Sequence, residues 1–190
     1  MRRRSARQNI DGPAGSVVVV APPVSPSGKW IRISRPDDPI HIVAFQGNLT
    51  HFRGDGTYVF STFLYIPSGS GLASIQFEPF GQPVSDYGDG FLHLDFTQDN
   101  RVRIDDDAGT TFGTFPRDQV FIVQVTLNIN ASSPSAHIVL SGAGASGEAD
   151  RNVIPPLRPK ASQFGAVRIW MDFPWTGSFE ATNVVVTRKS

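Results

Sequence analysis

The longest alternation of apolar and polar positions in the chain begins at residue 118 and ends at residue 141. Its apolar members at every second position are Phe121, Val123, Val125, Leu127 and Ile129. Gln124, Thr126 and Asn128 lie between them, so the two kinds of side chain fall on opposite sides of an extended backbone. This pattern predicts a long, half-buried strand. After a turn at residues 131–134, residues 135–141 continue the apolar face, which predicts an antiparallel hairpin.

Shorter alternating runs occur along the rest of the chain and predict further strands. The runs lie at residues 30–34, 39–45, 57–66, 72–79, 91–96, 101–105, 164–173 and 177–188. No stretch of eleven or more residues has an apolar stripe at helical spacing, so we expect negligible helix. The total is about eleven or twelve strands. Because so many strands must bury their apolar faces against each other, the sequence predicts an all-β, two-sheet antiparallel β-sandwich.

The first 28 residues differ in composition from the rest of the chain. Three consecutive arginines, Arg2 to Arg4, precede a valine run at residues 17–20 and a proline-rich stretch. This predicts a flexible N-terminal arm at residues 1–28 and one sandwich domain at residues 29–190. Two alternatives remain: an edge strand at residues 16–21, or a cleaved leader, against which the polar residues 8–13 argue. The valine run also suits pairing with the sheet edge of a neighbouring subunit, which predicts a homo-oligomer.

Charge and cysteine content exclude several classes of function. Lys and Arg number 17, as do Asp and Glu, so no long-range field steers the chain toward nucleic acid or an anionic membrane. The absence of cysteine excludes disulfides and thiolate metal sites, and it suits several compartments. No run approaches the ~18 apolar residues that a membrane span needs. We therefore expect no nucleic-acid partner and no membrane span.

Three features of the strand pattern resemble a known superfamily. They are the strand at residues 56–61 that leads into Tyr65-Ile66-Pro67, the hairpin at residues 91–104 with its successor at 119–130, and the closing run at 177–186, where Asn183 precedes valines. Over residues 30–188 the chain resembles the concanavalin A-like, laminin-G-like jelly-roll superfamily of lectins, glucanases and some polysaccharide lyases. The resemblance implies a jelly roll with a concave ligand-binding sheet, a calcium site on the convex sheet, and an extracellular or periplasmic location.

The polar face of the predicted strands carries the candidate ligand-binding residues. Trp170 lies between Arg168 and Asp172 at two-residue spacing, so these three side chains share one side of a sheet. A flat aromatic ring beside planar hydrogen-bonding groups suits a sugar ring. The whole outward-facing set is Gln76, Glu78, His93, Asp95, Arg101, Arg103, Arg168, Trp170 and Asp172, with Trp175 at the end of the groove. The alternative is a solvated sheet face with cross-strand ion pairs such as Asp95 with Arg103.

Catalysis on this face requires a carboxylate pair, which Glu78 with Asp95 or Asp172 would supply. The chain lacks the Glu-x-Asp-x-x-Glu and Glu-x-Asp-x-Glu motifs of the superfamily's glucanases. It also lacks the Gln-x-His and Tyr-x-Lys set of the alginate-lyase relatives. We therefore expect a non-catalytic, lectin-like carbohydrate-binding module. The alternatives are a structural or protein-interaction module that self-associates through its arm, and a polysaccharide-degrading lyase or glycoside hydrolase with a non-standard site.

One acidic run is the candidate metal site. Asp105, Asp106 and Asp107 offer the hard oxygen ligands that calcium prefers. Their spacing differs from that of known calcium loops, and consecutive aspartates also form turns. The four histidines never approach metal-ligand spacing, so we expect no zinc site. Beyond this structural calcium ion, the sequence predicts no cofactor.

Overall fold

The computed structural model describes residues 8–23, 28–36, 43–49, 54–79, 90, 92–104, 110–130, 133–152, 164–171 and 174–189. Within them the all-β prediction is confirmed, and fourteen strands are present. The strands are β1 (Gln8–Asp11), β2 (Val17–Val20), β3 (Trp30–Arg35), β4 (Val43–Asn48), β5 (Gly56–Tyr65), β6 (Ala73–Pro79), β7 (Leu92–Phe96), β8 (Arg101–Ile104), β9 (Thr111–Thr114), β10 (Val120–Ile129), β11 (Ser135–Ser141), β12 (Ser146–Arg151), β13 (Phe164–Met171) and β14 (Gly177–Lys189). No helix capable of crossing a membrane occurs in this part of the chain.

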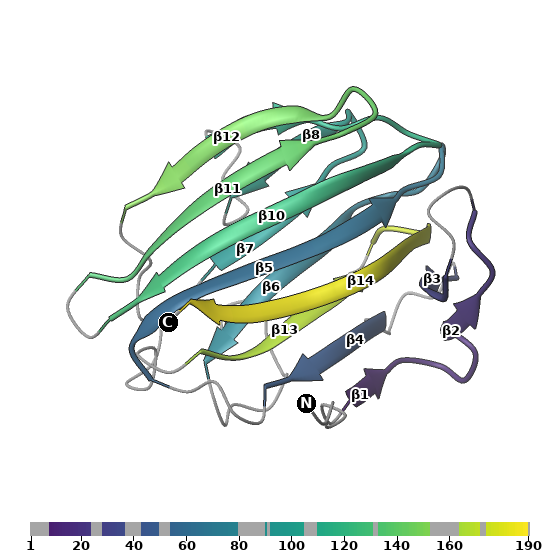
Figure 1. Ribbon diagram of the computed structural model, residues 1–190. Helices are drawn as coiled ribbons and strands as arrows, with labels where there is room; N and C mark the ends of the chain where they lie inside the picture. Colours follow the sequence, from purple (N-terminus) through teal and green to yellow (C-terminus); the bar gives the residue numbers. More distant parts are fainter. Residues whose placement is uncertain are drawn as a thin grey trace.

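The strands form one continuous hydrogen-bonded order that folds into two layers. The order is β1-β4-β13-β6-β7-β8-β9-β12-β11-β10-β5-β14-β3-β2. Figure 1 shows β12, β11, β10, β5 and β14 in one layer and β8, β7, β6, β13 and β4 in the layer behind it. β9 joins the layers at one side because it pairs with both β8 and β12. The order ends at β1 and β2, so the sandwich is open at its opposite side.

The core lies between the two layers and follows the predicted alternation. All five apolar members of β10 are buried, and Leu127 of β10 pairs with Ala136 of β11 in the expected antiparallel hairpin. Phe60 of β5 meets Phe77 of β6 edge to face, with ring centroids 5.1 Å apart and planes at 90°. Such pairs contribute beyond the area they bury, so this contact helps to hold the layers together.

Asn183, which precedes the valines of the closing strand, marks an irregularity in β14. The pairing of β14 with β5 shifts register between Thr182 and Val185. Asn183 has a φ of 50° there, in the left-handed region that asparagine tolerates better than most residues. The residue type therefore suits a β-bulge, which bends the strand.

The first 28 residues contribute two short strands at the open side of the sandwich. β1 pairs with β4, and β2 pairs with β3. β2 therefore matches the edge strand that the valine run suggested as an alternative. Val17 packs against the core, whereas Val18 and Val19 are exposed. Self-association through this strand stays a prediction.

Candidate functional site

The register of five neighbouring strands places polar side chains in a row across one face of the back layer. Trp170 of β13 lies opposite Ser74 of β6, and Ser74 lies opposite Asp95 of β7. Asp95 lies opposite Arg103 of β8, and Arg103 lies opposite Thr111 of β9. Neighbouring strands are ~4.8 Å apart, so the row is roughly 19 Å long. Residues far apart in the sequence thus share one face of the sheet.

A second row lies two residues along the same strands and carries more of the predicted set. Arg168 lies opposite Gln76, and Gln76 lies opposite His93. Glu78 lies one step further along β6, opposite Ala166 of β13. β13, β6 and β7 are therefore neighbours in one sheet, and these predicted residues share one face of it.

The predicted exposure is wrong for the six described members of the set on β6, β7 and β13. Gln76, Glu78, His93, Asp95, Arg168 and Trp170 point away from the core, yet each is at most 4% exposed. Gly90 lies against Gln76, because a Cβ built at Gly90 would come within 2.5 Å of the Gln76 side chain. Alternation identifies the face that turns away from the core, but it does not say whether that face meets solvent.

The buried polar groups contact one another. The Ser74 hydroxyl donates a 2.7 Å hydrogen bond to Asp95 Oδ1, and His93 Nε2 lies 3.2 Å from the same oxygen. The His93 ring stacks on Trp170, with centroids 5.5 Å apart and planes at 22°. The Arg168 guanidinium carbon lies 4.6 Å from the centre of the Trp170 ring. Trp170, predicted to stack on a sugar, packs instead against two protein side chains.

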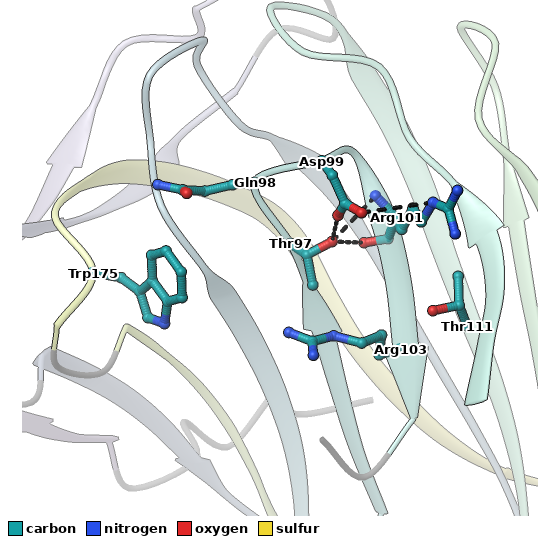
Figure 2. A pocket seen from close by; sticks show the side chains of 7 residues that line it. All are labelled: Thr97, Gln98, Asp99, Arg101, Arg103, Thr111 and Trp175. Atoms are coloured by element: carbon teal, nitrogen blue, oxygen red, sulfur yellow. Dashed lines mark hydrogen bonds and ion pairs between the residues drawn. The ribbon is translucent and has the colours of Figure 1, made fainter. Parts of the chain in front are cut away.

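An open pocket of about 320 Å³ adjoins this face at the turn between β7 and β8. Its lining is Thr97, Gln98, Asp99, Arg101, Arg103, Thr111 and Trp175. Figure 2 shows Trp175 and Thr111 on opposite sides of the pocket, with Arg103 between them. Arg103 and Trp175 belong to the predicted ligand-binding set and are both partly exposed. The pocket lining thus combines an aromatic ring, two guanidinium groups and two hydroxyls.

Asp99 holds one of the two arginines at the pocket rim. The Thr97 hydroxyl donates a hydrogen bond to the Asp99 carboxylate, which lowers the pKa of Asp99, with a smaller contribution from Arg101. Arg101 Nε lies 3.6 Å from Asp99 Oδ2. Because the carboxylate is stabilised in its charged form, it remains a counterion for Arg101 at mildly acidic pH.

Arg117 fixes the turn that carries the pocket residues. Its guanidinium donates to the carbonyl oxygen of Thr97 at 2.9 Å and to Asn100 Oδ1 at 2.8 Å. It also donates to the carbonyl oxygen of Ser70 at 3.0 Å, in the loop between β5 and β6. The guanidinium carbon lies 5.1 Å from the centre of the Phe115 ring. One side chain therefore ties together two loops, one of which carries pocket residues.

Asp118 should make the stability of the protein pH-dependent. Ser68 donates its hydroxyl and, at 3.0 Å, its N–H to the Asp118 carboxylate, and these bonds lower the pKa of Asp118. A lowered folded-state pKa gives stabilisation that is present above the unfolded-state value of about 3.9 and lost as pH falls through the folded-state pKa. We expect the melting temperature of the wild type to exceed that of Asp118→Asn at pH 7, and the difference to shrink as pH falls below the unfolded-state value of about 3.9.

Thermal unfolding followed by circular dichroism from neutral to acidic pH measures this difference. Asp118 has a φ of 57°, which asparagine tolerates, so the substitution isolates the charge. A difference that stays constant with pH would contradict the assignment of the stabilisation to the carboxylate.

Not all of the predicted site residues can be placed. Asp172 and the expected calcium ligands Asp105, Asp106 and Asp107 lie outside the described residues. Calcium binding there stays a prediction. Among the residues that the structure does describe, no group of three or more His, Asp or Glu side chains is arranged to hold a metal ion.

Four pocket residues, Thr97, Gln98, Asp99 and Thr111, are absent from the predicted set. The first three form the turn between β7 and β8. Polar residues are usual in hairpin turns, so their presence there does not indicate a binding site. Thr111 begins β9, a strand that the sequence pattern does not reveal. These residues become a site only because the fold brings Trp175 beside them.

Comparison with known proteins identifies the fold. No protein-family model matches the sequence, and no curated protein matches it significantly. Among solved structures, the catalytic domain of a GH131 β-glucanase from Podospora anserina superposes with a TM-score of 0.60 at 10% identity, over 98% of this chain and 86% of that one. A sialidase from Trypanosoma rangeli gives a TM-score of 0.51 at 12% identity, over 94% of this chain and 29% of the sialidase. The chain therefore has the concanavalin A-like jelly-roll fold that its strand pattern predicted.

Proposed function

We propose that the protein is a carbohydrate-binding jelly-roll module that holds its ligand in the pocket beside Trp175. The observation that carries the proposal is a partly exposed indole ring next to the Arg103 guanidinium in an open pocket. A sugar ring stacks on an aromatic face, and planar charged groups hydrogen-bond its substituents. The proposal moves the ligand from the face around Trp170, which is buried, to the pocket at its rim.

The fold supports a ligand of this class. The solved structures that superpose with TM-scores above 0.5 include a β-glucanase catalytic domain and a sialidase, which by their names act on glycans. Both are less than 15% identical to this chain, so they support the class of ligand and not its identity.

Trp175→Ala is expected to abolish glycan binding while the protein stays folded. The side chain lines the pocket, whereas its carbonyl oxygen, which accepts a 2.7 Å hydrogen bond from Arg35, is unaffected by the substitution. A glycan array identifies the ligand, and tryptophan fluorescence measures a dissociation constant that we expect in about the micromolar to millimolar range. Trp30 and Trp170 are fully buried, so Trp175 should dominate the fluorescence change.

Trp175→Phe is the matched control, because it keeps a flat ring and should retain most of the affinity. If Trp175→Ala loses binding and its melting temperature also falls steeply, the loss reflects unfolding and does not support a ligand site in the pocket. A wild-type protein that binds none of the neutral and acidic glycans on the array would contradict the proposed function.

A glycan-cleaving enzyme is the second candidate. The observation that favours it is that Glu78, His93 and Asp95 share one face, with Asp95 Oδ1 accepting from Ser74. Their burial argues against it, since substrate would need access to that face. Release of reducing ends from a polysaccharide, lost in Glu78→Gln, would establish the enzyme.

A further inference from the structure

The Arg103 guanidinium lines the pocket, and its side chain is partly exposed there. Its Nε is inaccessible to solvent and makes no hydrogen bond within the described part of the chain. Asp95 lies opposite Arg103, but its Oδ1 already accepts from Ser74 and lies near His93. The positive charge of the guanidinium attracts an anion that enters the pocket, and the planar group hydrogen-bonds a carboxylate or sulfate strongly. Arg103 is therefore prepared for an anionic group in the pocket.

The pocket continues beyond Arg103 along the rim of the sandwich. Arg101 and Thr111 also line a second cavity of about 350 Å³, which extends over β9 to the start of β12. Gly113 and Gly147 are part of its lining, and the two backbones pack closely, since a Cβ built at Gly147 would lie 2.6 Å from Gly113 Cα. The two cavities share Arg101 and Thr111, so they are neighbours, with Trp175 in the lining of the first and Gly147 of β12 in the lining of the second. We call the two cavities together the groove.

We propose that this groove binds a linear, anionic oligosaccharide. Arg103 holds a carboxylate or sulfate of the sugar that stacks on Trp175, and Arg101 meets the anionic group of a following sugar. Guanidinium groups bind both anions through paired hydrogen bonds. Asp99 lies near Nε of Arg101, which leaves the two terminal nitrogens of that arginine for the ligand. This inference rests on the proposed function and adds the class of glycan.

Calorimetric titration of the full chain with matched tetrasaccharides tests the inference. The probes are oligogalacturonate, which carries carboxylates, a heparin-derived oligosaccharide, which carries sulfates, and neutral laminaritetraose and cellotetraose. We expect at least one anionic probe to bind about tenfold or more tightly than the neutral ones, and tetrasaccharides to bind more tightly than disaccharides. The anionic probe that binds identifies the group.

Arg103→Gln is expected to weaken binding of the anionic probe by about tenfold or more. The matched control is Lys189→Gln, which removes one positive charge from an exposed position on β14 in the other layer and should leave the affinity unchanged. If Arg103→Gln does not fold, Arg101→Gln provides a second variant, because Arg101 lies exposed at the rim.

Three outcomes would overturn the inference. Neutral tetrasaccharides that bind as tightly as anionic ones, with binding lost in Trp175→Ala, would overturn the anionic class and leave the proposed function intact. Equal losses of affinity in Arg103→Gln and Lys189→Gln would show that the anionic probe responds to the net charge of the protein and not to Arg103. Absence of binding to every probe would overturn the inference, and the glycan array would then decide whether the proposed function also fails.

Discussion

Replacement of Leu127 by alanine is expected to lower the free energy of unfolding by about 2 to 5 kcal/mol. Leu127 is fully buried in the second half of β10, between Ala136 of β11 and Tyr58 of β5. Removal of its branched side chain loses apolar burial and leaves a cavity that close-packed neighbours fill only in part. The loss is a large share of the stability of a domain of this size.

Gln124→Ala is the matched control on the same strand. Gln124 is exposed on the other face of β10, so its substitution should change the free energy of unfolding by less than about 0.5 kcal/mol. Denaturant unfolding measures both variants, and the slope of free energy against denaturant should remain that of the wild type. Equal losses in the two variants would mean that the odd-numbered face of β10 is not the core.

The central strands were predictable because a strand that is buried on just one of its faces alternates strictly between apolar and polar residues. β10 and β11 have one side in the core and the other partly exposed, and the sequence shows this directly. β12 was missed because its inward positions carry small residues, such as Gly147 and Ala149. Small residues are needed there, since Gly147 packs on the backbone of Gly113, and they give no apolar signal.

The candidate site was predictable in part. The alternation assigned Arg168, Gln76 and His93 to one face, and the structure confirms that they are neighbours. Their burial was not predictable, because it depends on segments remote in sequence, such as Gly90 over Gln76. The pocket likewise needs Trp175, from the loop between β13 and β14, beside the turn of β7 and β8. Such proximity follows from topology, which local patterns do not encode.

Arg117→Ala is expected to weaken both the fold and the pocket. In this variant the partly buried carbonyl oxygens of Thr97 and Ser70 lose the hydrogen bonds that the Arg117 guanidinium donates to them. Unsatisfied acceptors cost free energy, so we expect a loss on the order of 3 kcal/mol. The turn that begins at Thr97 should also loosen, and glycan affinity should fall with it. Arg117→Lys keeps the positive charge but loses the planar guanidinium group. Its free energy of unfolding and its glycan affinity should therefore lie between those of the wild type and Arg117→Ala.

Arg188→Ala separates this network from a general effect of removing an arginine. Arg188 donates to the carbonyl oxygen of Asp55 and lies 5.8 Å from the Tyr58 ring centre, but it is exposed and holds no pocket loop. Its removal should cost less than about 1 kcal/mol and leave glycan binding unchanged. Denaturant unfolding and hydrogen exchange of the amides at residues 97–101 measure the two effects. Equal costs for Arg117→Ala and Arg188→Ala, with unchanged exchange in that turn, would show that Arg117 does not hold the pocket in place.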